Sequence, residues 1–98
     1  MSILTKKLFD ELENKDFEIK INENNNESFS LIEIKSVNSH TTAEGQAEPF
    51  ALLFQSNNET IYDQGIYTLK NIELNEINIF LVPIGSNETG TQYEAVFT

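Results

Sequence analysis

Histidine, cysteine and carboxylate side chains carry most enzymatic and metal chemistry, and this chain is unevenly supplied with them. Its 98 residues contain no Cys and one His, whereas Asp and Glu together number 16. The single histidine, His40, lies in a polar stretch between Asn38 and Thr42, and a lone histidine in a loop is usually solvated. Zinc is held by a compact set of His, Cys or carboxylate ligands, so an ordinary zinc site is not expected.

Carboxylates are the remaining candidates for chemistry. Glu44 and Glu48 flank a long polar segment, and Glu59 and Asp63 flank a turn. Paired-acid catalysis needs two carboxylates held at a defined separation in a cleft, for which a chain of this length offers little room. Residues 24–27 lack the alternating spacing of an EF-hand loop. We therefore predict a protein that is not an enzyme, with no catalytic, cofactor-binding or metal-binding residues, and keep a calcium-binding or small-ligand-binding β-barrel as the alternative.

The charge balance restricts the partners. The net charge is −10 and all six basic residues are lysines, which disfavours contact with nucleic-acid phosphates or anionic membranes. An acidic inhibitor that mimics nucleic acid is a lesser alternative, because each half of the chain carries a net charge of −5 with no block of like charge. No signal peptide or membrane span is recognisable, so the expected location is the cytoplasm, a virion or a phage-tail-like particle.

Hydrophobic spacing indicates which elements must position any site. Leu4, Leu8 and Leu12 recur every fourth residue, which predicts a short helix over residues 3–13. From Asp16 onward the period becomes two, as in a half-buried strand. A break in the alternation between Leu31 and Ile32 predicts a β-bulge.

The rest of the chain predicts further short strands with turns between them. We expect strands at residues 29–37, 50–54, 61–69, 77–84 and 93–97, with a turn at 24–26 and a long loop at 38–49. Gly65 should mark a bulge or a close backbone approach, and Pro83 should lie near a strand end or on an edge. Short links favour antiparallel neighbours. The predicted fold is mainly β, a single domain over residues 1–98: a small antiparallel barrel or two-layer sandwich of about six strands with one short N-terminal helix.

Two of these strands, residues 50–54 and 77–84, are apolar on both faces. Either they are central strands covered on both sides, or one face is exposed and buries against a partner or a second copy. The last strand ends near the chain terminus and could form a free edge that accepts another strand. The residues predicted for a partner interface on this basis are Phe50, Leu52, Phe54, Ile77, Ile79, Leu81 and Phe97.

Four segments carry a family resemblance. Residues 49–54 (PFALLF), 64–69 (QGIYTL), 79–85 (IFLVPIG) and 93–97 (YEAVF) follow one another closely. This succession resembles an uncharacterised bacterial family, domain-of-unknown-function family six-nine-one-six, along nearly the whole chain. The resemblance implies a small β-rich protein with no assigned activity, of a kind often encoded beside proteins with phage tail-collar domains.

Together these observations favour a non-enzymatic structural or interaction module. The expected partner is a protein, specifically a tail-collar or fibre protein of a phage-tail-like particle, with self-association as a further possibility. No cofactor, nucleic acid or membrane is expected among its ligands.

Overall fold

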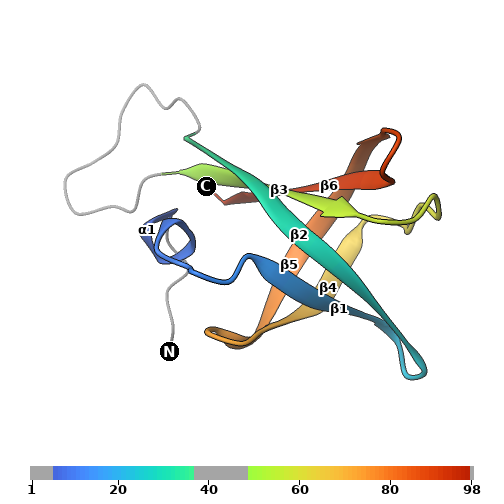
Figure 1. The fold of residues 1–98 in the computed structure, drawn as a ribbon, viewed down its shortest axis with the longest axis horizontal. Coiled ribbons are helices and arrows are strands. Elements are labelled where there is room, and N and C mark those ends of the chain that lie inside the picture. The colour runs from blue at the N-terminus through green and yellow to red at the C-terminus, as the bar shows by residue number, and fades with distance from the viewer. Residues whose placement is uncertain (1–5, 37–48, 98) are drawn as a thin grey trace.

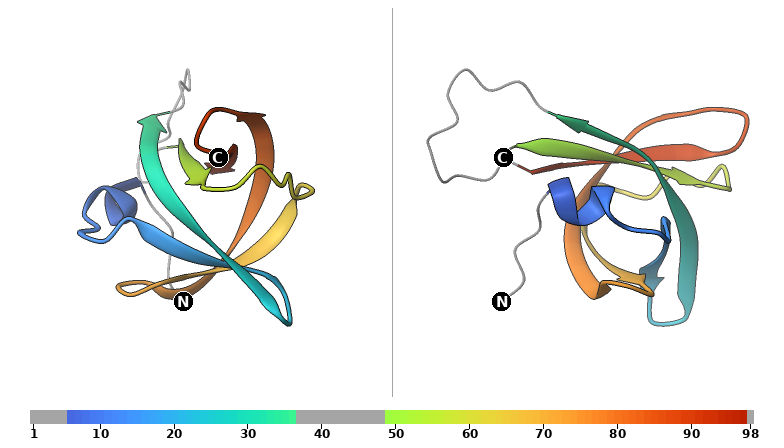
Figure 2. Two further views of the ribbon diagram at one scale, coloured as in Figure 1. Left: turned by 45° about the vertical axis from the view of Figure 1, so that its right-hand side comes forward. Right: turned by 60° about the vertical axis from the view of Figure 1, so that its left-hand side comes forward.

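Within residues 6–36 and 49–97, which the computed structural model describes, six antiparallel strands close into a barrel beside one short helix (Figures 1 and 2). The elements are α1 (Lys6–Asp10), β1 (Asp16–Asn22), β2 (Asn25–Ser36), β3 (Phe50–Ser56), β4 (Gly65–Asn71), β5 (Asn75–Ser86) and β6 (Thr91–Phe97). The order around the barrel is β1-β2-β3-β6-β5-β4, and pairing of β4 with β1 completes the ring. The mainly β class is confirmed, and of the two predicted architectures the barrel is the one that forms.

The hairpin of β1 and β2 follows directly from the alternating sequence. Phe17 and Ile19 are buried, whereas the residues between and beside them are exposed. The turn expected at residues 24–26 is wrong by one to two positions, because Asn25 already pairs with Asn22 at the start of β2. The side-chain Oδ1 of Asn22 accepts a hydrogen bond from the Asn24 N–H at 2.9 Å, so this earlier asparagine supports the turn.

The predicted bulge in β2 is confirmed. The pairing of β2 with β3 runs in register up to Leu31 opposite Phe54 and resumes at Glu33 opposite Leu53, which leaves Ile32 without a partner. The extra residue keeps Leu31 buried while Ile32 is about half exposed. A bulge increases the local twist of a strand, which suits a strand of 12 residues that pairs first with β1 and then with β3.

The strand predicted to open at Ile61 begins later. Ile61 and Tyr62 belong to the connection between β3 and β4, and β4 starts at Gly65. The Tyr62 N–H donates to the hydroxyl of Tyr93 at 3.0 Å, so its backbone is satisfied by a side chain in place of a strand neighbour. Gly65 marks neither a bulge nor a close approach, because a Cβ atom built there would meet nothing within 4 Å.

Strand β5 changes partners along its length. Residues 75–81 pair with β4, and residues 82–86 pair with β6. Pro83 lies just past the point where β5 leaves β4, so its missing N–H removes no hydrogen bond to that strand. The register then shifts between Pro83 and Gly85. Of the two predicted placements, a strand end or an edge, Pro83 has the second: β5 continues to Ser86, but at Pro83 it pairs with β6 alone.

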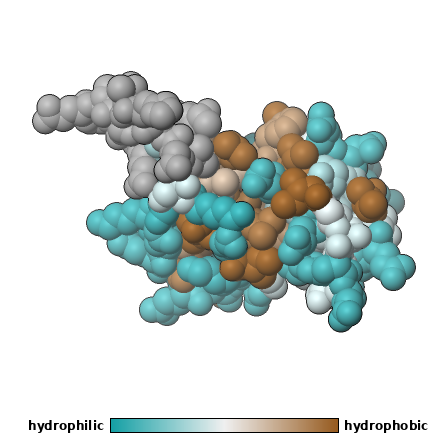
Figure 3. Space-filling model, turned by 90° about the horizontal axis from the view of Figure 1, so that it is seen from above, coloured by the Kyte–Doolittle hydropathy of each residue, from teal (hydrophilic) through white to brown (hydrophobic). Residues whose placement is uncertain are grey.

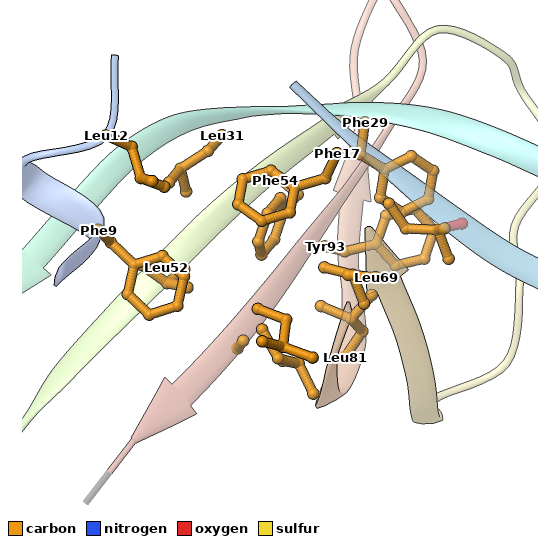
Figure 4. Packing of buried hydrophobic residues seen from close by; sticks show 14 of the residues in the cluster. Phe9, Leu12, Phe17, Phe29, Leu31, Leu52, Phe54, Leu69, Leu81 and Tyr93 are labelled. Atoms are coloured by element: carbon orange, nitrogen blue, oxygen red, sulfur yellow. The ribbon is translucent and has the colours of Figure 1, made fainter. Parts of the chain in front are cut away.

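Aromatic rings fill the interior of the barrel (Figure 4). Phe17 meets Phe54 edge to face with ring centroids 5.3 Å apart, and Phe29 stacks on Tyr93 at 4.8 Å. Such pairs add to the stabilisation from simple burial. The remaining fully buried side chains come from every strand, so the inward faces of all six strands share one core.

Helix α1 lies at one end of this core, beside β2 (Figures 1 and 2). Phe9 is completely buried and its ring packs on Phe50 and Phe97, with centroids 5.8 and 6.1 Å away. The helix ends sooner than predicted, and residues 3–5 lie outside the described part of the chain. Lys15 accounts for the early end, because its Nζ donates to the carbonyl oxygens of Phe9 and Leu12 at 2.9 and 2.6 Å, groups that a continuing helix would use.

Candidate interaction surface

The residues predicted for a partner interface lie inside the barrel. Phe50, Leu52, Phe54, Ile77, Ile79 and Leu81 are all buried, and Phe97, which is partly buried, stacks on Phe50 with centroids 4.6 Å apart. That set is therefore core and not surface. The predicted residues do share one face of β3 and one face of β5. That face points into the barrel, so the exposed apolar face is the opposite one.

The predicted free edge at the last strand is confined to its final three residues. β6 pairs with β3 over residues 92–97 and with β5 over residues 91–94. Its last three residues have a strand neighbour on one side, and Phe9 packs against Phe97 beside them. The backbone of β6 is thus engaged on both sides along most of its length, which leaves little room for strand addition.

The opposite face of the same strands carries an exposed apolar surface, which we name the outer stripe: Leu53, Ile66, Phe80, Val82 and Val96. Strand pairing places them on the outward face of four neighbouring strands, β4, β5, β6 and β3. Ile66 of β4 lies opposite Phe80 of β5, and Val82 follows two residues later on the same face. Ile66 is 73% exposed, Val96 55% and Phe80 50%. Figure 3, which looks onto the molecule from the β3 and β6 side, shows hydrophobic patches between hydrophilic regions.

Glu94 lies within the outer stripe. The register puts it between Val82 of β5 and Leu53 of β3, and Val96 follows two residues later on β6. Glu94 is partly buried and makes no hydrogen bond or ion pair with the described residues. The nearest lysines along the sheet are one strand beyond the neighbours of β6, and both are paired, with Lys35–Glu33 at 3.4 Å and Lys70–Glu76 at 3.6 Å. The stripe is therefore an apolar surface with one carboxylate that has no partner among the described residues.

A polar network holds the β3–β4 connection against the barrel. The Glu27 carboxylate accepts hydrogen bonds from Asn58 Nδ2 at 2.8 Å and from the Tyr62 hydroxyl at 3.0 Å. Burial, followed by the hydrogen bond to Glu27 and its negative charge, raises the pKa of Tyr62 above its ordinary value of 10. Each buried side-chain nitrogen and oxygen in the described residues has a partner, so these groups serve to fix the connection.

A second polar cluster joins β1 to the β4–β5 turn. Asn71 is buried; its Nδ2 donates to the carbonyl oxygens of Asn14 and Asp16, both at 3.0 Å. Its Oδ1 accepts from the N–H groups of Glu73 and Leu74 at 2.8 and 3.1 Å. A shallow depression of about 370 Å³ lies beside it, lined partly by Asp16, Glu18 and Lys70. Because every hydrogen-bonding group of Asn71 is used locally, we interpret the cluster as structural.

The comparisons with known proteins identify a family. A family model described as "Domain of unknown function (DUF6916)" matches residues 4–97. The chain belongs to this family. No curated protein and no solved structure matches it. The family resemblance expected from the four C-terminal segments is thus confirmed.

The residues that the sequence analysis weighed for catalysis or metal binding in this DUF6916 domain are described only in part. His40, Glu44 and Glu48 lie outside the described residues. Among residues 6–36 and 49–97, no three His, Cys, Asp or Glu side chains come together in a way that could hold a metal ion. No helix in that part of the chain has the length and apolar character that crossing a bilayer requires.

Sequence reasoning missed the exposed members of the outer stripe. Phe80, Val82 and Ile66 lie within the segments that carry the family resemblance, but none of them is among the residues predicted for the interface. One signal was available: Glu94 has the same parity on β6 as Val96, and an unpaired carboxylate marks the face of a strand that points toward water. The strand neighbours of Glu94 on that face are Leu53 and Val82, which belong to the outer stripe.

Proposed function

We propose that this DUF6916 domain is a non-enzymatic interaction module that binds a protein partner through the outer stripe. The observation that carries the proposal is the outer stripe, in which Ile66 pairs with Phe80 and Val96 is also exposed, on the outside of a barrel whose interior is already filled. Isolated exposed apolar residues are normal on a protein surface, whereas adjacent ones mark interaction sites. The polar clusters around Glu27 and Asn71 support the same proposal, because their groups are committed to holding the fold.

The partner class we propose is a tail-collar or fibre protein of a phage-tail-like particle. Two points support it. The family resemblance implies proteins that are often encoded beside tail-collar proteins, and the outer stripe is an exposed apolar surface of the kind that binds other proteins. The closed barrel favours docking by side chains over strand addition, since strands on both sides of the stripe already have neighbours.

Affinity capture from the host lysate tests this proposal. Phe80→Lys places a charge in the stripe, and Asn78→Lys, two residues earlier on the same outward face of β5, is the matched control. We expect wild type and Asn78→Lys to recover a tail-collar or fibre protein in stoichiometric amounts, and Phe80→Lys to lose it while keeping its melting temperature. Retention of that protein by a folded Phe80→Lys variant would contradict the proposal.

A further inference from the structure

We infer that Glu94 determines the specificity of the outer stripe and selects a partner segment that places an Arg or Lys side chain among apolar residues. The inference rests on the proposed function and adds the chemistry of the partner to it. Three properties of the described residues lead to it: the position of Glu94, the state of the surrounding charges, and the engagement of the strand backbones.

The position of Glu94 means that a ligand on the stripe must cover it. Val82 lies on one side and Leu53 on the other, both partly buried, and Val96 is the next outward residue on the same strand. A partner that covers these three apolar side chains also removes water from the carboxylate between them. Removing water from a carboxylate is unfavourable unless an opposite charge or hydrogen-bond donors replace it.

The surrounding charges cannot supply that replacement. The strands on either side of β6, β3 and β5, contain no lysine. One strand further away, Lys35 of β2 is 3.4 Å from Glu33 and Lys70 of β4 is 3.6 Å from Glu76, so each already has a carboxylate. The cation must therefore come from the partner. Arg fits this position best, because its planar guanidinium can form two parallel hydrogen bonds to a carboxylate while its stem packs on apolar side chains.

The backbone around Glu94 restricts how the partner binds. β6 is hydrogen-bonded to β3 on one side and to β5 on the other at this position, where Glu94 pairs with Leu53 and Val82. A partner segment cannot add as a new strand here, so recognition must come from side chains. One charge among apolar contacts then provides the main means of discrimination.

A second copy of the chain is a poor occupant of the stripe. Each copy has a net charge of −10, and two stripes face to face would bury two Glu94 carboxylates without a cation between them. A segment with positive charge instead gains from the long-range attraction of the acidic domain.

Selection from a random 12-residue peptide library, displayed on phage, tests the inference. Binders are selected on the wild-type domain and depleted on Phe80→Lys, so that only stripe-dependent peptides remain. We expect these peptides to share an Arg or Lys with apolar residues close on either side. Their synthetic copies should bind Glu94→Gln about tenfold more weakly than wild type. Glu88→Gln, which changes the net charge equally at an exposed turn residue, should alter binding less than about twofold.

The outcomes separate this inference from the proposed function. Stripe-dependent peptides that lack a basic residue, or that bind Glu94→Gln as well as wild type, would overturn the role of Glu94 and leave the interaction surface standing. Failure to recover any peptide that requires Phe80 would overturn both. Sedimentation of the wild type as a dimer that Phe80→Lys dissociates would also overturn the inference, because a second copy would then occupy the stripe.

Discussion

Of the three glycines in the described residues, Gly90 is the one at which an added methyl group has the least room. A Cβ atom there would lie 2.6 Å from the Ser56 carbonyl oxygen and 2.7 and 2.8 Å from the backbone oxygen and nitrogen of Asn58. These are backbone atoms of the last residue of β3 and of the connection that follows it, which is fixed by the Thr91 N–H donating to Asn58 O at 3.1 Å. The close approach of two chain segments thus depends on the absence of a side chain.

We therefore expect Gly90→Ala to lower the free energy of unfolding by about 2 kcal/mol or more, since the overpacked backbone must move. Urea unfolding followed by circular dichroism measures this. Gly85→Ala is the control, because nothing lies within 4 Å of a Cβ at Gly85, and its effect should stay within roughly 1 kcal/mol. Equal effects of the two substitutions would contradict the steric explanation.

At the same scale, sequence alternation predicts two faces but not always which one is inside. Along β1 the answer is evident, because Phe17 and Ile19 alternate with charged residues. Along β5 both faces are apolar, and the choice between Ile79 and Phe80 has no local basis. It is decided by the partners across the barrel, where Ile79 joins the common core and Phe80 does not.

At the scale of elements, the connection between β3 and β4 is a stretch of irregular chain held by side chains from other strands. Tyr62 contacts β2 through its hydroxyl, which donates to Glu27 at 3.0 Å, and contacts β6 through its N–H, which donates to the Tyr93 hydroxyl. Burial, and then the hydrogen bond to Glu27, raises the pKa of Tyr62 above 10. The pKa of Tyr67 is raised as well, chiefly by burial.

These raised pKa values predict loss of stability in alkali. A phenol that holds its proton more tightly in the folded state stabilises that state up to about pH 10, and the contribution is lost as pH rises through the folded pKa. Tyr62→Phe should be less stable than wild type at pH 7 by about 1–2 kcal/mol, from the lost hydrogen bond to a carboxylate. Above pH 10 its stability should fall less steeply, with Tyr67 accounting for part of the remaining slope. Urea unfolding from pH 7 to 11.5 measures both effects; a parallel decline of the two proteins would contradict the role of Tyr62.

Sequence patterns predicted correctly those elements that are determined by neighbouring residues in the chain. The bulge at Ile32 follows from a break in parity, and the β1–β2 hairpin follows from alternation on either side of a polar turn. The signals failed where an element depends on distant chain. Ile61 and Tyr62 have the composition of a strand, but Tyr93 and Glu27 bind the backbone and hydroxyl of Tyr62 and hold the segment outside the sheet.

At the scale of the whole molecule, one short strand pairing, between β1 and β4, closes the sheet into a barrel. Glu18, Ile19 and Lys20 of β1 pair with Lys70, Leu69 and Thr68 of β4, about fifty positions later in the sequence. Turns predict which strands are neighbours along the chain, but no turn joins β1 to β4 or β3 to β6. Closure therefore had to be learned from the structure, because it depends on how six twisted strands fit around one set of aromatic rings.

The charge of the whole chain makes a prediction that individual contacts do not. The ion pairs in the described residues are Lys6–Asp10, Lys7–Glu11, Lys35–Glu33 and Lys70–Glu76, and all have substantial solvent exposure. Exposed pairs contribute between about 0 and 1 kcal/mol each. The net charge of −10 on 98 residues has the opposite effect, because repulsion among like charges destabilises a compact state.

We expect repulsion to dominate, so that added salt stabilises the protein. Raising NaCl from about 10 to about 200 mM shortens the screening length from roughly 30 Å to below 10 Å. The melting temperature should rise by several degrees, which corresponds to about 1 kcal/mol for a chain of this size. Glu59→Lys, at an exposed residue without a described partner, changes the net charge from −10 to −8. The melting temperature of this variant should rise less with added salt. If the melting temperature instead fell with salt, the few exposed ion pairs would outweigh the repulsion among the acidic residues, and the acidic surface would have to be arranged so that its charges are individually compensated.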